Sequence, residues 1–61
     1  MPLPDGLILG FVLDYSHLDL GYNTVVMLLD RDRTAFYRGR GDSQEEATED
    51  AIKNWKQDAW T

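Results

Sequence analysis

Two segments of this chain are apolar on both faces of the strand that each would form, and a single amphipathic helix follows them. The segments run from Leu7 to Tyr15 and from Tyr22 to Leu29, and the helix from Gln44 to Trp60. Side chains of a strand alternate between the two faces of a sheet, whereas one helix covers only one face. The sequence therefore predicts a small sheet with one face that the chain itself leaves uncovered.

Turn-forming and charged residues separate the predicted elements. Residues 30–33, Asp-Arg-Asp-Arg, predict a short hairpin turn, and a third, more polar strand follows over residues 34–40. Ser43 and Glu46 fit a capping box, in which each side chain accepts a hydrogen bond from the other residue's N–H. We therefore expect one α+β domain over residues 1–61, a three-stranded antiparallel β-meander followed by a C-terminal α-helix packed on one sheet face (βββα).

The predicted core joins one face of the strands to the apolar stripe of the helix. Period two places Leu7, Leu9, Phe11 and Leu13 on one strand face, and Gly10 either permits a close approach or marks a bulge. Trp60 is expected to pack on the core at the helix end, and the alternative is an exposed aromatic anchor for a partner. The residues expected to pack between sheet and helix are Phe11, Leu13, Val26, Leu28, Ala47, Ala51, Ile52 and Trp55.

Length and composition favour an oligomer. A chain of 61 residues is only marginally stable alone. It has no cysteine and one histidine, so a disulfide framework, a thiolate metal site and a multi-histidine site are excluded. Oligomerisation is the remaining common means of stabilising so small a domain. We expect a homodimer, formed through the uncovered sheet face or a strand edge, and no cofactor.

The first residues and the lengths of the apolar runs predict where the protein is located. The first residues contain no basic leader. The longest strictly apolar run, Val25 to Leu29, is far shorter than the roughly 20 residues that cross a bilayer. We expect a cytoplasmic protein without a membrane partner.

All arginines of the chain fall within residues 31–40, although the net charge is −5. An exposed sheet face with arginine and an aromatic ring can bind nucleic acid through phosphate pairing and stacking. The alternative is a solvated edge strand whose arginines pair with acids of the helix or of a second subunit. The negative net charge of the chain favours this alternative, because it opposes binding to nucleic acid. The candidate nucleic-acid or partner contacts are Arg31, Arg33, Arg38, Arg40 and Phe36.

Acidic residues at the helix start form a second candidate surface, one that an acidic inhibitor would present to a nucleic-acid enzyme. These residues are Glu45, Glu46, Glu49 and Asp50.

The sequence offers no clear catalytic or metal site. His17, between Asp14 and Asp19, could hold a divalent metal or act as a base, but a solvent-exposed turn histidine is the simpler interpretation. No nucleophile set or paired-carboxylate cleft stands out, so we expect no catalytic residue and no enzyme.

Residues 41–55 resemble HicB-like antitoxin domains, which carry a G-D-T-x-E-E-A-x-x-x-A pattern where their third strand enters the helix. Residues 19–22, Asp-Leu-Gly-Tyr, also look like the D-G-G-Y turn of that family. The family's P-D-L-P-G loop is replaced here by residues 30–33. Residues 39–47 are similar to the last strand and helix of double-stranded RNA-binding domains, with acids where those domains place lysine.

Three functions remain open from the sequence. The first is a small non-catalytic protein-interaction or regulatory domain, homodimeric and related to HicB-like antitoxins through the resemblance. The second is a nucleic-acid-binding module that uses the arginine-rich hairpin. The third is an acidic inhibitor protein of the kind that mobile elements encode.

Overall fold

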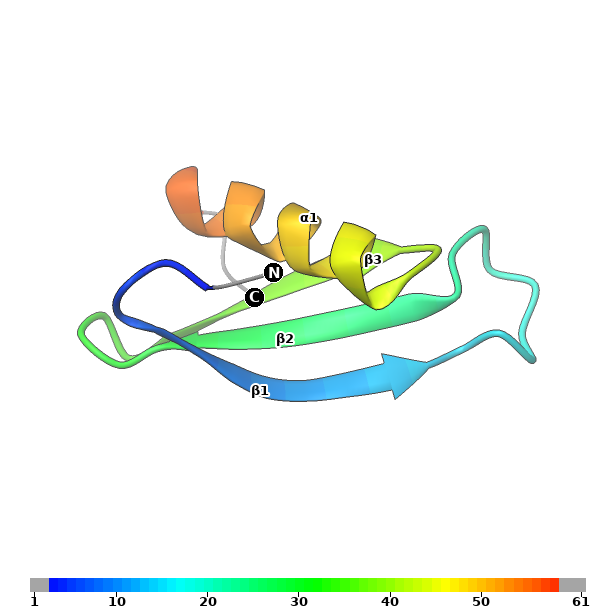
Figure 1. The fold of residues 1–61 in the computed structure, drawn as a ribbon, viewed down its shortest axis with the longest axis horizontal. Helices are drawn as coiled ribbons and strands as arrows, with labels where there is room; N and C mark the ends of the chain where they lie inside the picture. The colour runs from blue at the N-terminus through cyan, green and yellow to red at the C-terminus, as the bar shows by residue number, and fades with distance from the viewer. Residues whose placement is uncertain (1–2, 59–61) are drawn as a thin grey trace.

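The described residues form one antiparallel sheet and one helix in the order β1, β2, β3, α1. This computed structural model describes residues 3–58. The elements are β1 (Leu7–Asp14), β2 (Thr24–Asp30), β3 (Ala35–Gly41) and α1 (Gln44–Lys56). β2 lies between β1 and β3, and α1 packs on β3 and β2, so β1 lies at the margin of the sheet away from the helix (Figure 1). The predicted βββα fold is confirmed.

Small residues let α1 lie close to β3. Ala47 and Ala51 are fully buried, and both face Gly39. A Cβ added at Gly39 would overlap the carbonyl oxygen of Ala47 and the amide nitrogen of Ala51. Backbone atoms of α1 and β3 therefore approach each other closely at Gly39, and the helix lies over β3 and β2.

The ends of α1 have identifiable causes. Ser43, in extended backbone, accepts a hydrogen bond from the N–H of Glu46 at 3.2 Å. The Glu46 carboxylate accepts from the N–H of Asp42 at 3.0 Å, not from Ser43 as the capping box predicts. The helix stops at Lys56 because Asp58 takes φ 55°, with its N–H donating to the Trp55 carbonyl. The expected extension to Trp60 is therefore wrong beyond Lys56, and Trp60 itself lies outside the described residues.

The core forms on the helix side of the sheet, but β1 contributes less to it than the alternation predicts. A bulge lies between Leu9 and Phe11, so Leu9 pairs with Leu28, whereas Phe11 pairs with Met27. The strand changes face at this point. Phe11 and Leu13, predicted to be in the core, lie on the opposite face and are 46% and 39% exposed. The buried cluster is Leu7, Val26, Leu28, Ala47 and Ala51, with Leu3, Ile52 and Trp55 packed against it.

The helix-facing side of β1 is also partly uncovered. Leu9 and Val12 lie opposite Leu28 and Val26 on that side, yet they are 43% and 38% exposed. Since α1 packs on β3 and β2, its side chains do not cover this strip. Among residues 3–58 no helix has the length and hydropathy needed to cross a bilayer.

Candidate functional site

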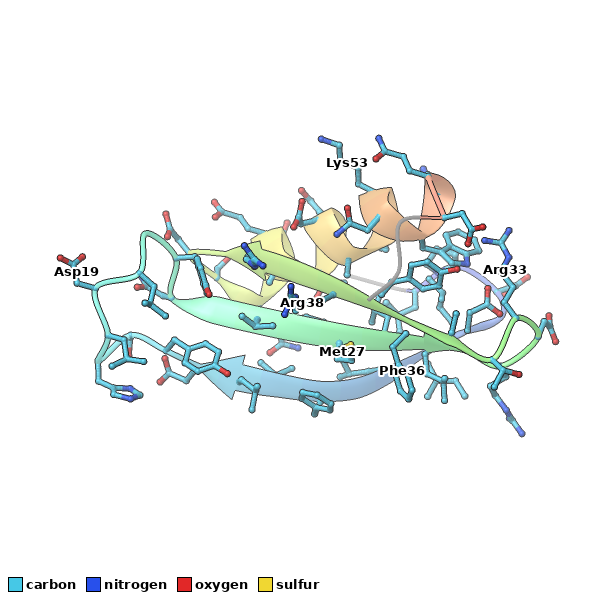
Figure 2. All side chains as sticks on the ribbon, turned by 180° about the vertical axis from the view of Figure 1, so that it is seen from behind. Asp19, Met27, Arg33, Phe36, Arg38 and Lys53 are labelled. Carbon is cyan, nitrogen blue, oxygen red and sulfur yellow. The ribbon has the colours of Figure 1, made fainter. Side chains whose placement is uncertain are left out.

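The face of the sheet turned away from α1, here called the open face, is built from alternate residues of all three strands. The cross-strand register arranges it in three rows. These rows are Ile8, Leu29 and Phe36; Phe11, Met27 and Arg38; and Leu13, Val25 and Arg40. Phe36 projects from β3 away from α1, with Met27 and Arg38 nearby on the sheet (Figure 2). The open face therefore carries apolar side chains on β1 and β2, two arginines on β3, and no acidic residue.

A shallow hollow lies at the Arg40 end of the open face. Arg40 places its guanidinium 5.3 Å from the centroid of the Tyr22 ring, and Tyr22 meets Tyr15 edge to face with ring centroids 6.4 Å apart. The hollow has a volume of about 170 Å³, below the 300–1,000 Å³ typical of small-molecule sites. It suits a side chain of a macromolecular partner. Its lining is Phe11, Leu13, Tyr15, Tyr22, Val25, Met27, Arg38 and Arg40.

Arg33, one of the predicted contact residues, has a structural role at the other end of the molecule. Its Nη1 lies 3.5 Å from Oδ1 of Asp58 and from the Trp55 carbonyl oxygen, and its guanidinium lies 5.9 Å from the Trp55 ring. Its Nε lies 3.7 Å from Oδ2 of Asp30. Figure 2 shows Arg33 and Asp19 at opposite ends of the molecule. Within residues 3–58 the ion pairs all involve Arg33, so the guanidinium groups of Arg38 and Arg40 form no ion pair there.

Asp30 is the buried centre of the network that includes Arg33. It is 4% exposed and accepts a hydrogen bond from Nε1 of Trp55 at 2.7 Å. It also accepts from the N–H groups of Asp32 and Arg33. The Trp55 hydrogen bond, followed by these backbone donors and the charge of Arg33, lowers the pKa of Asp30 despite its burial. Nearby, the Tyr37 hydroxyl donates to Asp58 at 2.8 Å.

Sequence reasoning missed this network. One local signal was available: an aspartate that ends an apolar run and precedes a turn can accept hydrogen bonds from the turn N–H groups. Asp30 does so. The partnership with Trp55 joins residues 25 positions apart in the chain, and no local pattern indicates it.

Side chains of α1 cover the outer edge of β3. The Asp50 carboxylate accepts from the N–H of Arg40 at 3.0 Å, and the Asn54 side-chain amide donates to the carbonyl of Arg38. Two members of the predicted acidic surface, Glu46 and Asp50, are thus engaged in hydrogen bonds to backbone N–H groups. Glu45 and Glu49 are exposed.

The outer edge of β1 has none of these features. Residues 7–13 are uncharged, and five exposed apolar side chains lie on this one strand. Edge strands usually carry charges, prolines or covering elements that discourage pairing with other chains. The five are Ile8, Leu9, Phe11, Val12 and Leu13.

The remaining predicted contact, Arg31, is separate from Arg38 and Arg40. It is exposed on the turn between β2 and β3 and lines a wide hollow of about 540 Å³ with Asp32 and the start of β1. The four arginines therefore lie in three different places. The part of the chain that the structure describes contains no group of three or more His, Cys, Asp or Glu side chains that could hold a metal ion.

Comparison of the chain with known protein families, curated proteins and solved structures gives no match.

Proposed function

We propose that this protein is a small non-catalytic interaction domain that forms a homodimer, with the open face as its interface. The observation that supports this best is the composition of that face, where exposed apolar side chains lie beside two arginines whose guanidinium groups form no ion pair within the described part of the chain. Contiguous apolar surface of this kind marks interaction sites on soluble proteins. The cytoplasmic location expected from the sequence is part of the proposal.

A protein partner fits the open face better than a small ligand or a polymer of negative charge. Aliphatic side chains fill much of the face, namely Ile8, Leu13, Val25, Met27 and Leu29. Arginine and aromatic residues at the edge of an apolar centre are typical of protein interfaces. A second copy also supplies what a domain of 61 residues lacks, since it adds buried apolar area to a small core.

Two neighbouring residues of β1 provide a matched test. Leu13 is 39% exposed on the open face, and Val12 is 38% exposed on the helix-facing side. In Leu13→Lys we expect the dimer dissociation constant to rise at least about a hundredfold, because an ammonium group would be buried in an apolar contact. Val12→Lys places the same charge on the same strand at the same exposure, and we expect it to leave the dissociation constant within a few-fold of the unmodified chain.

Sedimentation equilibrium of the two variants measures both constants. Equal weakening by the two substitutions would mean that the partner binds along β1 as a whole and not through the open face. No weakening by Leu13→Lys would remove the open face from the interface. Circular dichroism of each variant verifies that the fold is retained.

Nucleic-acid binding is the second candidate, and one observation favours it. Arg38 and Arg40 share the open face with two exposed phenylalanine rings, Phe11 and Phe36. Rings of this kind can stack on bases while arginines contact phosphates. Retention of the chain by single-stranded nucleic acid at low salt, lost in an Arg38→Ala, Arg40→Ala double variant, would support this function.

The HicB-like regulatory role and the acidic inhibitor stay predictions. A regulatory role of the HicB-like kind would use the same dimer as a platform. An acidic inhibitor would rely on Glu45 and Glu49, since Glu46 and Asp50 already hold backbone groups. Capture of a nucleic-acid enzyme that is lost in a Glu45→Gln, Glu49→Gln double variant would support the inhibitor.

A further inference from the structure

We infer that the second copy packs on the open face about a two-fold axis parallel to the strands, so that β3 of each copy lies over β1 of the other. This inference rests on the proposed homodimer and adds its geometry. It follows from how charge is distributed across the face, and it predicts which side chains meet.

The open face has one basic column and one apolar column. β3 contributes Phe36, Arg38 and Arg40, and β1 contributes Ile8, Phe11 and Leu13. β2 lies between them with Val25, Met27 and Leu29. Each column therefore lies on one side of the face, about two strand spacings of 4.8 Å from the other.

A two-fold axis along the strands brings these columns together. Rotation about such an axis, placed over β2, puts β3 of one copy above β1 of the other and keeps every row opposite its own equivalent. Arg38 then faces Phe11 of the second copy, Arg40 faces Leu13, and Phe36 faces Ile8. β2 packs against β2 at the centre, through Met27 and Leu29. Each arginine meets an apolar or aromatic side chain, and no two arginines meet.

A two-fold axis across the strands gives a worse match. It puts β3 over β3 of the second copy, and when the sheets are centred on the middle row the two Arg38 side chains face each other. Like charges placed opposite each other in an interface weaken association. The position of both arginines on one outer strand therefore selects the axis along the strands.

The distances fit known packing of sheets and of arginine on aromatic rings. Two aligned sheets pack about 10 Å apart with their strands rotated by about 30°. An arginine side chain spans much of this gap, and a guanidinium within about 6 Å of a ring centroid is attracted to it. Arg40 already makes such a contact with Tyr22 within one copy, at 5.3 Å. The arrangement repeats this pairing between copies, with Arg38 and Phe11.

Cysteine cross-linking tests the axis directly, because the natural chain contains no cysteine. We would prepare Ile8→Cys and Phe36→Cys separately, mix them and oxidise them. We expect a disulfide between the two different chains to form at least about tenfold faster than in the control, because the two positions are held opposite each other. The control mixes Phe36→Cys with Val12→Cys, since Val12 faces the helix side. Phe11→Cys alone tests the other axis, because it keeps both arginines and Phe11 would then face its own equivalent in the second copy.

The outcomes separate this inference from the proposed homodimer. Fast cross-linking of the Ile8 and Phe36 variants supports the axis along the strands. Fast self-linking of Phe11→Cys, or no difference from the Val12 control in a chain that is dimeric by mass, overturns the inference and leaves the homodimer standing. A chain that is monomeric by mass and links no pair faster than the control overturns both.

Discussion

The two outer strands of this sheet are protected very differently. On β3, Asp50 and Asn54 of α1 hydrogen bond to the backbone of Arg40 and Arg38, and the helix packs on the strand through Gly39. On β1, seven consecutive uncharged residues, Leu7 to Leu13, form the edge, and most of their side chains are exposed on both faces.

The difference shows how far one helix can reach. α1 lies against β3 because Gly39 and two alanines remove the side chains that would hold it away. Lying there, it covers one face of β3 and β2 and leaves β1 and the open face uncovered. Among residues 3–58 one helix covers one side of the sheet, so the molecule has a closed half, the helix-covered side of β2 and β3, and an open half, β1 together with the open face. The following substitutions test that division, from the largest expected effect to the smallest.

The helix contact with β3 is the least tolerant point of the closed half. In Gly39→Ala the added methyl would overlap backbone atoms of Ala47 and Ala51, which cannot move without shifting α1. We expect a loss of at least about 3 kcal/mol in the free energy of unfolding, enough to unfold much of the protein. Gly10→Ala on β1 is the matched control. Its added methyl would lie 3.0 Å from the Met27 carbonyl oxygen, and we expect a change of about 1 kcal/mol or less.

Urea denaturation at one fixed protein concentration measures both variants. Equal loss in the two would mean that the closed and open halves do not differ in how tightly their backbones are packed.

Trp55 joins the core to the polar network. It packs against the buried cluster and donates to the buried Asp30 carboxylate. We expect Trp55→Ala to lower the free energy of unfolding by about 3 kcal/mol or more, through lost packing and a buried acceptor without its donor. Trp55→Phe keeps most of the packing and removes the donor, so its loss should be about 1–3 kcal/mol. A cooperative melt of Trp55→Ala at nearly the unmodified temperature would contradict this role.

Acid should weaken the closed half through Asp30. Its pKa is lowered in the folded protein, chiefly by the Trp55 hydrogen bond, from an ordinary value of 3.8. The stability that its charge contributes is therefore fully present above pH 3.8 and is lost as the pH falls through the lower folded value. Thermal melts from neutral pH into this acid range should show a falling melting temperature.

An Asp30→Asn variant should show a shallower decline over the same acid range. The control variant is Asp14→Asn. The Ser16 N–H lowers the pKa of Asp14 too, but Asp14 lies on β1, where it is exposed. A variant Asp30→Asn whose acid dependence matches that of the unmodified chain would contradict the role assigned to Asp30.

The edge hydrogen bonds of β3 should have the smallest effect. In Asn54→Ala the Arg38 carbonyl loses its donor, and we expect a loss of about 1 kcal/mol because water can replace it. Adding Asp50→Ala exposes the N–H of Arg40 as well and leaves β3 as open as β1. Light scattering of the double variant should show self-association beyond that of the unmodified chain. A double variant with unchanged mass would mean that these contacts do not protect the edge.

Local pattern was enough to predict the elements and their order. Alternating β-branched and apolar residues indicate the strands, and Ser43 marks the helix start. Gly10 indicates either a close backbone approach or a bulge. The structure has a bulge there, which moves Phe11 and Leu13 to the face opposite the one that uninterrupted alternation predicts. The helix end depended on Asp58 adopting a left-handed backbone, which aspartate does only occasionally.

The candidate site was predictable only in part. A cluster of arginines in one ten-residue window was visible, but which of them would be used inside the protein was not. Arg33 turns toward Asp30, Asp58 and Trp55 because the hairpin turn lies beside the helix end. That proximity depends on the fold as a whole. Arg38 and Arg40 share one strand face because side chains alternate along a strand, and the packing of α1 makes this the open face.

The measurement that tests the central claim most directly is the solution mass of the unmodified chain, by light scattering after size exclusion, over about a hundredfold range of concentration. If the open face is closed by a second copy, the mass should correspond to two chains of 7.0 kDa at the higher concentrations. A single chain at every concentration would contradict the claim that this surface is a homodimer interface.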